Sequence, residues 1–352
     1  MALSRLDIAL GQQGLDLPVA GEIGILRADE TQDYSALPAD RLRLFNSFRP
    51  SFDALQGQGY RVAAQPEGKF AAMMVHVTRS KAETLGLVAS ALSLCQAGGT
   101  VMVDGPRKDG IDSVLKHCRK FLEIDQVVVK NHGRMFWMTR PETLPDEILD
   151  WKRGLELSRN SDGFLTAPGM FSSEHIDAGS ALLAEHFDDR LSGHIADLGA
   201  GWGWLAVRAL KAGGNAIEQI DLYEAEDRAL EAAKANITDE RARFFWSDVT
   251  KLTPAARYDA IICNPPFHQG RAATPSLGLE FITMARKLLK PGGSLWLVAN
   301  RQLPYENTLA ASFARLTPLA ENAQFKVVLA SKPITGTTRP EQRTSRSIRR
   351  NR

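Results

Sequence analysis

The 352-residue sequence contains few cysteines and no long apolar run. Its three cysteines are far apart and form no CxxC pair, which favours a reducing compartment over a disulfide-stabilised secreted fold. No stretch approaches the roughly 18 apolar residues of a membrane span, and residues 1–20 lack the layout of a signal peptide. The seven histidines show no paired spacing with acids or cysteines. These absences predict a cytoplasmic globular protein without a metal site, and its length predicts two domains.

Charge is distributed unevenly, although the formal net charge is only +2. Between Ser331 and Arg352 seven basic residues face one acid, Glu341, so the rest of the chain is slightly acidic. We expect residues 336–352 to form a disordered basic tail, in which Arg339 and Arg343 attract RNA phosphates through counterion release. A solvated terminus that only improves solubility is the alternative.

The second half of the sequence alternates strand and helix patterns with short connections, which is typical of a doubly wound α/β sheet. A Lys-Pro-Gly-Gly turn at 290–293 predicts the end of a helix. The expected strands are 195–198, 219–223, 243–246, 258–263, 294–299 and 325–330, and the expected helices are 204–212, 226–236 and 276–289.

The first half repeats this plan in pattern, not in identical residues. Strand patterns at 73–76, 101–103 and 133–140 surround a helix that runs to Leu94 and a Gly-Gly turn. We therefore predict a duplicated α/β domain. The predicted parts are a first domain at 1–140, a linker at 141–163, a second domain at 164–335 and the tail at 336–352.

A glycine-rich stretch follows the first predicted strand of the second half. Asp197 is followed by Gly199, Gly201 and Gly203 and then by a helix, so the backbone can pass close to a ligand where no Cβ intervenes. A dinucleotide site would require glycine or alanine where this chain has Trp204. The stretch therefore favours a different nucleoside cofactor, with Asp197 and the three glycines in its site.

Two acids follow the next two strands. Glu224 is placed to accept both hydroxyls of a ribose, and Asp248 is placed to accept from an adenine amino group. Taken singly, each acid is better explained as a helix N-cap or a surface residue; together with the glycines and the motif described next, both favour a cofactor site. In the first half, Gly21–Asp29 lacks a glycine triplet and His76–Arg79 replaces the motif described next. We therefore expect the first domain to bind no cofactor, and either to hold RNA or to brace the second domain.

Asn264-Pro265-Pro266-Phe267 follows the fourth strand, at the edge where open α/β sheets bind ligands. The Asn264 carboxamide and the Pro265 carbonyl can each accept an N–H of a planar amine, which turns its delocalised lone pair outward. The prolines hold these acceptors stiffly, and Phe267 offers a stacking face for a flipped base. With the glycine-rich stretch, this motif predicts an S-adenosylmethionine-dependent methyltransferase in which Asn264 also borders the cofactor. His268 is either a contact to substrate phosphate or a loop residue without a role.

These motifs resemble those of the bacterial small-subunit ribosomal RNA guanine-N2 methyltransferases and their large-subunit siblings. The resemblance implies an α/β fold of two tandem class I (Rossmann-like) methyltransferase domains, the N-terminal one degenerate, with one cofactor site and the second domain catalytic. It also implies methylation of a guanine N2 amine in 16S rRNA, with Asn264 as the orienting residue. It also implies that Phe171 lies near the cofactor or the target base; a loop merely packed on the sheet is the alternative. The chain departs from the family at 173–175, where Arg-Asp-Gly is expected, and in its bulky Trp202 and Trp204. The resemblance rests on 168–172, 199–203, 264–268, Gly270, 299–300, 303–305 and 325–327.

Several alternatives remain open on the sequence. A large-subunit rRNA guanine-N2 methyltransferase, an adenine-N6 methyltransferase and a protein-glutamine methyltransferase would all suit the Asn-Pro-Pro-aromatic motif. A non-catalytic RNA-binding protein of ribosome assembly is disfavoured by the intact motifs, and an oxidoreductase is disfavoured by Trp204. The expected partner is ribosomal RNA or the small ribosomal subunit, with no membrane and no metal, and the expected state is a monomer.

Overall fold

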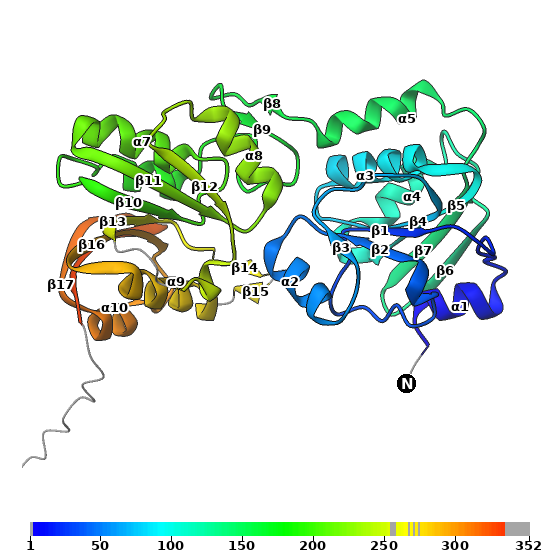
Figure 1. Ribbon diagram of the computed structural model, residues 1–352, viewed down its shortest axis with the longest axis horizontal. Helices are drawn as coiled ribbons and strands as arrows, with labels where there is room; N and C mark the ends of the chain where they lie inside the picture. The colour runs from blue at the N-terminus through cyan, green and yellow to red at the C-terminus, as the bar shows by residue number, and fades with distance from the viewer. Residues whose placement is uncertain (1–2, 254–257, 267, 270–271, 274, 335–352) are drawn as a thin grey trace, which may run out of the picture.

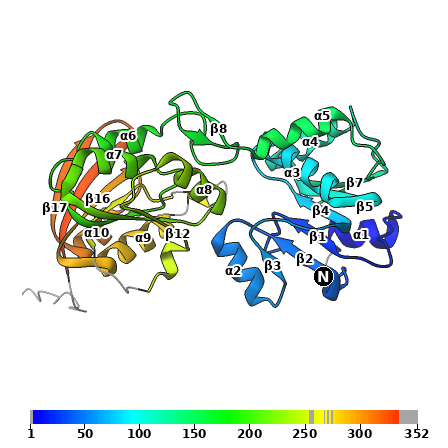
Figure 2. The same cartoon turned by 45° about the horizontal axis from the view of Figure 1, so that its top comes forward.

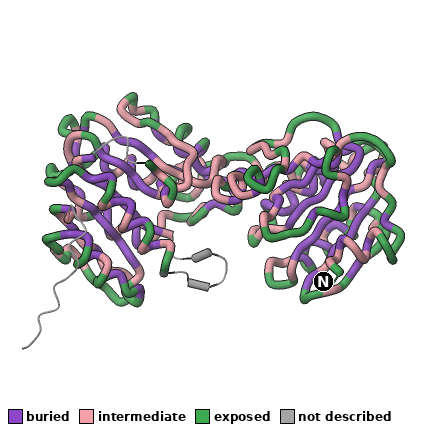
Figure 3. The backbone as a smooth tube through the Cα atoms, turned by 60° about the horizontal axis from the view of Figure 1, so that its bottom comes forward, coloured by how far each residue is buried: buried purple, intermediate pink, exposed green. Residues whose placement is uncertain are grey.

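The chain forms two lobes, each built around one seven-stranded sheet (Figure 1). The computed structural model describes residues 3–253, 258–266, 268–269, 272–273 and 275–334, with no side-chain description for 268–269, 272–273 and 275. Buried segments run through the interior of each lobe, as Figure 3 shows in purple. The lobes lie side by side along the long axis of the molecule.

The first lobe contains a sheet of strand order β3-β2-β1-β4-β5-β7-β6. Its strands are β1 (Ile23–Leu26), β2 (Leu42–Phe45), β3 (Val62–Ala63), β4 (Phe70–His76), β5 (Cys95–Pro106), β6 (Gln126–Lys130) and β7 (Gly133–Thr139). Its helices are α1 (Arg5–Gln12), α2 (Arg49–Gly57), α3 (Lys81–Leu94) and α4 (Ile111–Cys118).

The second lobe contains a sheet of strand order β12-β11-β10-β13-β16-β18-β17. Its strands are β10 (Gly193–Leu198), β11 (Ile217–Glu224), β12 (Ala242–Trp246), β13 (Tyr258–Cys263), β16 (Leu289–Asn300), β17 (Phe313–Glu321) and β18 (Phe325–Pro333). Its helices are α6 (Ala178–Ala184), α7 (Trp204–Gly213), α8 (Asp227–Asn236), α9 (Pro275–Leu288) and α10 (Glu306–Ser312). A short hairpin pairs β14 (His268–Gln269) with β15 (Ala272–Ala273).

The two sheets have the same topology, which confirms the predicted duplication of an α/β fold. In both, the last two strands run antiparallel to their neighbours and the remaining strands are parallel. The equivalent strands β5 and β16 even share one twelve-residue pattern of buried and exposed positions. Strands buried on both faces must be apolar nearly throughout, which explains why β4 and β13 were visible in the sequence.

Helices cover both faces of each sheet (Figure 2). In the second lobe, α6, α7 and α8 pack on one face around Ile195 and Ile262. On the other face α9 and α10 pack around Ile261 and Leu297. The helix after β10 and the helix after β13 therefore lie on opposite faces, so the strand order reverses between these two strands. Open α/β sheets bind ligands at such a reversal point.

The first lobe differs from the second where a cofactor would bind. Between β1 and β2 it has no counterpart of α7 in residues 27–41, which contain only the 3₁₀ helix Ala39–Arg41. The residues between the lobes include α5 (Asp146–Trp151), a 3₁₀ helix at Lys152–Leu155, and β8 (Ser158–Arg159) paired with β9 (Leu165–Thr166). Ile148 of α5 is fully buried in the core of the first lobe.

Most strand and helix ends expected in the second half are present within two residues. The exceptions are β16, which begins at Leu289, and β18, which extends to Pro333. The Lys-Pro-Gly-Gly segment lies inside β16. The pairing register between β13 and β16 shifts at this point, so the strand accommodates the turn-forming residues as a local irregularity. The sequence patterns did not predict α6, α10, β17 or most of the first lobe's outer elements. No helix within the described residues is long and apolar enough to cross a membrane.

Candidate active site

The strands that carry the predicted motifs end level with one another. In the central parallel pairs, Leu198 of β10 lies opposite Tyr223 of β11 and Cys263 of β13, and Glu224 of β11 lies opposite Trp246 of β12. The segments that follow these strands, with Gly199, Glu224, Asp248 and Asn264, therefore share one edge of the sheet. Asn264 follows β13, next to the reversal point described above.

The Asn264 carboxamide is fixed in one orientation. Its Nδ2 donates to Asp177 Oδ2 at 2.9 Å and to Ser180 Oγ at 2.8 Å. An ionised carboxylate only accepts hydrogen bonds, so the amide nitrogen must face Asp177. The Asn264 oxygen remains as the acceptor, which is the group that the predicted chemistry requires. The next residue, Pro265, is buried, and Pro266 is partly buried.

Asp177 and Ser180 belong to the site although the sequence did not reveal them. Asp177 is the N-cap of α6, and its Oδ2 also accepts from the Ser180 backbone N–H at 2.7 Å. The Asp-x-x-Ser pattern signals only a helix start. A single acid thus begins the helix and holds the carboxamide of a residue that lies 87 positions later in the chain.

Asp177→Ser is expected to lower kcat about tenfold, the equivalent of about 1.4 kcal/mol, because serine caps a helix but does not reach Asn264. Asp177→Asn is the matched control, since its carbonyl oxygen can still accept from both the helix and Asn264. Single-turnover methyl transfer measures the rate, and thermal unfolding checks that the two variants are equally stable. Equal rates for the two variants would contradict the orienting role of Asp177.

The glycine loop has a backbone that glycine favours. Gly199, Gly201 and Gly203 have φ values of +77°, +55° and +89°, in the left-handed region where other residues are strained. A Cβ on Gly203 would lie 2.8 Å from Ile237 Cδ1, so close packing against α8 also requires glycine there. A Cβ on Gly201 would meet nothing within 4 Å. Gly201 therefore borders open space, where a ligand can approach the backbone.

Glu224 connects this loop to the turn before α8. Its Oε2 accepts from Gly201 N at 2.7 Å, and its Oε1 accepts from Glu226 N at 2.8 Å. Burial raises the pKa of Glu224 above its ordinary value, while these backbone donors act in the opposite direction. Each carboxylate oxygen keeps a further lone pair, so Glu224 can bind the loop and also accept from a ribose hydroxyl.

Asp248 has a structural role that leaves one of its oxygens for a ligand. It is the N-cap of the 3₁₀ helix Val249–Lys251, and its Oδ1 accepts from both the N–H and the hydroxyl of Thr250. Its Oδ2 lies 3.6 Å from Lys251 Nζ. The N-cap alternative raised for Asp248 is thus correct, and it is compatible with the predicted contact to an adenine amine.

Asp197 lies beneath the glycine loop and has no solvent exposure. Within the described residues its carboxylate oxygens form no hydrogen bond of ordinary geometry, although the backbone N–H of Ala206 acts to lower the pKa of the carboxyl. Burial, together with the nearby charge of Glu224, raises the pKa of Asp197 to about 8. The carboxyl is therefore protonated over most of the neutral range.

This protonation predicts a stability that falls as pH rises. In the unfolded chain Asp197 ionises near pH 3.8, whereas in the folded chain it keeps its proton up to about pH 8. Its contribution to the free energy of unfolding is fully present below about pH 4 and is lost as pH rises through about 8. Asp197→Asn removes this titration and is expected to flatten the slope. Urea unfolding between pH 5 and pH 8 measures it, and identical slopes for variant and wild type would contradict the raised pKa.

The segment around Phe171 lies against the glycine loop. Trp202 Nε1 donates to the Phe171 carbonyl at 3.0 Å, and the Trp202 ring packs among Ala167, Met170 and α8. The bulky Trp202 therefore points into the protein and is only 5% exposed, whereas the Phe171 side chain is 56% exposed. The sequence had marked Trp202 as large for a cofactor loop; its function here is to attach this segment.

A small cavity joins these parts. It is lined by Phe171, Asp177, Gly199, Gly201, Trp204 and Asn264, among others. Its enclosed volume is about 60 Å³, so most of a nucleoside would lie outside it, along the strand ends at Glu224 and Asp248. Three features of the site suit an adenosine-containing cofactor. They are the open backbone at Gly201, the Glu224 carboxylate as an acceptor for ribose hydroxyls, and the partly exposed ring of Phe171.

The remaining predicted residues lie outside the described parts of the chain. Phe267, Arg339 and Arg343 are not described, and His268 is described only by its backbone in β14. Among described residues, no group of three or more His, Cys, Asp or Glu side chains is arranged to hold a metal ion. All three cysteines are buried and free.

Comparison with known proteins gives concordant results. The family model for the methyltransferase small domain matches residues 162–329. The chain is 32% identical over 274 residues to the ribosomal RNA small subunit methyltransferase C of Shewanella sp. (strain MR-4), covering 74% of this chain and 77% of that relative. The protein of the same name from Shewanella amazonensis is 29% identical over 321 residues, with 89% and 92% covered.

A solved structure shares the whole two-lobed fold. It is the T. thermophilus 16S rRNA N2 G1207 methyltransferase in complex with AdoMet and guanosine. The TM-score is 0.75 at 23% sequence identity, and 90% of each chain is covered. At this identity the match supports the fold, with two tandem methyltransferase-like domains.

Proposed function

This chain belongs to the ribosomal RNA small subunit methyltransferase C family, and we propose that it methylates the exocyclic N2 amine of a guanine in 16S rRNA. The observation that carries the proposal is the fixed Asn264 carboxamide beside the glycine loop. When bound, S-adenosylmethionine supplies an electrophilic methyl group on a sulfonium sulfur. The chain is thus an S-adenosylmethionine-dependent rRNA methyltransferase.

The residues of the second lobe divide the work between cofactor and base. Glu224 would accept from the ribose of the cofactor and Asp248 from its adenine amine, while Gly199, Gly201 and Gly203 would let the backbone approach it. Asn264 Oδ1 and the Pro265 carbonyl accept the two N–H groups of the guanine amine. This pairing turns the nitrogen lone pair toward the methyl group. Alignment of two bound reactants supplies about 7–11 kcal/mol of the barrier, so positioning is the main task of these residues.

Methyl transfer to defined RNAs tests this proposal. The full-length chain is incubated with labelled S-adenosylmethionine and with 16S rRNA, 23S rRNA or assembled small subunits, and the modified nucleotide is mapped. Mapping begins at G1207, the guanine named for the T. thermophilus protein. Label at a guanine N2 of 16S rRNA is the expected result. Label only in 23S rRNA, at adenine N6 or in protein would replace the proposed substrate, and no transfer to any of them would contradict the activity.

We further propose that the enzyme is a cytoplasmic monomer and that its basic tail contributes to RNA binding. Removing residues 339–352 deletes six arginines and one acid. Binding to 16S rRNA is expected to weaken, and its dependence on salt concentration to become shallower, because fewer counterions are released. Filter binding at several salt concentrations measures the slope. An unchanged slope would limit the tail to a role in solubility.

A further inference from the structure

The two lobes meet through equivalent turns of the duplicated fold. One turn leads from β2 into α2, and the other leads from β11 into α8. They form an antiparallel bridge in which Arg49 N donates to the Ala225 carbonyl and Asp227 N donates to the Ser47 carbonyl, each at 2.8 Å. The same backbone positions of the two copies are thus paired with each other, at the start of a helix in each lobe.

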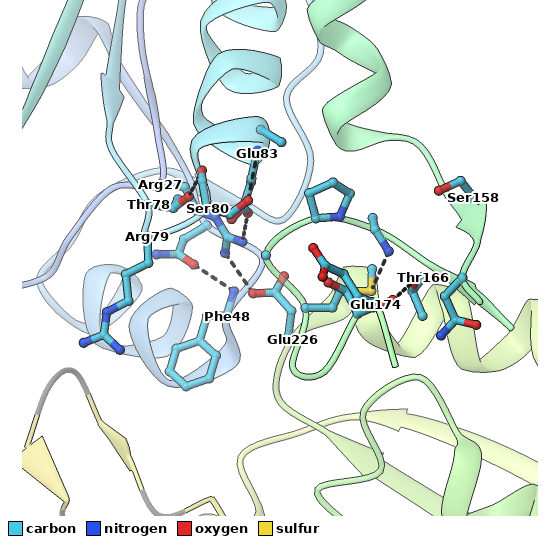
Figure 4. A pocket seen from close by; sticks show the side chains of 18 of the residues that line it. Arg27, Phe48, Thr78, Arg79, Ser80, Glu83, Ser158, Thr166, Glu174 and Glu226 are labelled. Carbon is cyan, nitrogen blue, oxygen red and sulfur yellow. Dashed lines mark hydrogen bonds and ion pairs between the residues drawn. The ribbon is translucent and has the colours of Figure 1, made fainter. Parts of the chain in front are cut away.

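A buried ion-pair cluster accompanies this bridge (Figure 4). Arg27, which follows β1, lies between two carboxylates: it contacts Glu83 of α3 and pairs with Glu226 of the second lobe at 2.8 Å. Arg27 also donates to Ser47 Oγ at 3.1 Å. From the second lobe, Arg228 reaches the same Glu83 at 3.2 Å. The Glu83 side chain is only 3% exposed, so both arginines neutralise a buried charge.

The charges of this cluster depend on one another. Burial opposes ionisation of Arg27, yet the carboxylates of Glu226 and Glu83 hold its pKa above the ordinary value. Burial likewise opposes ionisation of Glu226, and Arg27 holds the pKa of Glu226 below its ordinary value. Arg27, Glu83 and Glu226 line a cleft of about 1450 Å³ between the lobes. Removing Arg27 would leave Glu226 without its closest cation.

The bridged turn is continuous with the candidate cofactor site. Glu226 N donates to Glu224 Oε1, and Glu224 Oε2 accepts from Gly201 N. The position of Glu226 therefore sets the position of the Glu224 carboxylate, which in turn contacts the glycine loop. If this turn moved, the Glu224 carboxylate, which is the proposed acceptor for the ribose, would move with it.

A second contact reaches the other acid of the site. Trp246, at the end of β12, donates its Nε1 hydrogen to the carbonyls of both Ser47 and Ala225, at 3.1 and 2.8 Å. The ring of Phe52 in α2 packs edge-on against Trp246, with the ring centroids 5.0 Å apart. Trp246 precedes Asp248 by two residues, so the first lobe contacts the strand ends that carry both Glu224 and Asp248.

We propose that the first lobe completes the cofactor site, and that Arg27, Ser47, Glu83 and Glu226, here called the interlobe clamp, position Glu224 for binding. The clamp residues do not touch the cofactor; they are positioning residues. A preorganised acceptor costs less to bind because the turn is already ordered. This inference rests on the proposed function, since it takes Glu224 as the ribose acceptor.

Cofactor affinity in full-length variants tests the clamp. Arg27→Met is expected to weaken binding of S-adenosylhomocysteine about tenfold in titration calorimetry, with a smaller loss for Glu226→Gln. The double variant should bind no more weakly than Arg27→Met, because both substitutions break the same pair.

At saturating cofactor, kcat and the KM for rRNA should stay near wild type. Without cofactor, the amides of residues 224–230 should exchange hydrogen faster in Arg27→Met.

Arg5→Met is the matched control. Arg5 forms a comparable ion pair with Asp104 in the first lobe, and its side chain is 14% exposed against 19% for Arg27. It does not contact the second lobe through this pair, so it should lower stability without changing cofactor affinity. Equal weakening by Arg5→Met would show general loosening and would overturn the clamp.

The remaining outcomes separate the clamp from the proposed function. If Arg27→Met does not fold, Glu226→Gln decides, because glutamine keeps the length and most of the packing of the glutamate side chain while removing its charge. Wild-type affinity in folded clamp variants would overturn the clamp alone. A wild-type chain that bound no S-adenosylhomocysteine would contradict the proposed cofactor, and the clamp with it.

Discussion

Replacing Asn264 by alanine is expected to lower kcat about 10²–10³-fold, the usual cost of removing one preorganised polar group from a reacting centre. The carboxamide oxygen is fixed by the two hydrogen bonds that Nδ2 makes to Asp177 and Ser180, and its proposed role is to accept an N–H of the target amine. Without it the amine lone pair stays delocalised into the base. Cofactor affinity should change little, because Glu224, Asp248 and the glycine loop are intact.

Single-turnover methyl transfer to 16S rRNA, together with calorimetric titration of the cofactor, measures the two effects separately. Asn322→Ala is the control for stability, since Asn322 accepts from Gln324 N and Phe325 N in the turn between β17 and β18. That variant should lose stability and keep its rate. Wild-type turnover in Asn264→Ala would show that the target amine is oriented by other groups.

Glu224→Gln is expected to weaken cofactor binding about 100-fold or more, the cost of losing a charge-assisted acceptor and of leaving a buried donor unpaired. In the wild type both carboxylate oxygens accept backbone N–H groups, from Gly201 and from Glu226. A glutamine must direct its own NH₂ group at one of these donors. The glycine loop and the bridged turn would then separate, and the ribose would lose its acceptor.

Calorimetric titration with S-adenosylhomocysteine measures this loss. Glu218→Gln is the matched control: Glu218 lies on the same strand, its side chain is 70% exposed, and it pairs with His194 at 3.3 Å. Removing its charge should leave affinity unchanged. If Glu224→Gln bound as tightly as wild type, the ribose would be held elsewhere and the role assigned to Glu224 would be wrong.

The parts of the site that were predictable lie next to buried parallel strands. Such strands are short apolar runs, and their carboxyl ends meet at one edge of the sheet. A glycine loop, two acids and Asn264 directly after four of these strands therefore had to come together. The structure places all of them at that edge.

The parts that were missed lack a local pattern. Helix α6 has only seven residues, and its N-cap Asp177 has the same appearance as any other helix start. Trp202 was noted as bulky for the cofactor loop, whereas the structure shows that its ring packs inward and its Nε1 attaches the Phe171 segment. The direction in which the Trp202 side chain points from the glycine loop depends on its packing against other parts of the chain, namely Ala167, Met170 and α8.

By itself, the sequence determined the duplicated α/β plan and the groups available for chemistry, because apolar periodicity and motif spacing are local properties of the chain. Only the tertiary structure decided how Asn264 is turned, why Asp197 keeps its proton, and which residues of the first lobe support Glu224. These features depend on contacts between residues far apart in the chain, such as Arg27 and Glu226, 199 positions away. A buried charge also acquires its pKa and its partner only when the surrounding core excludes water.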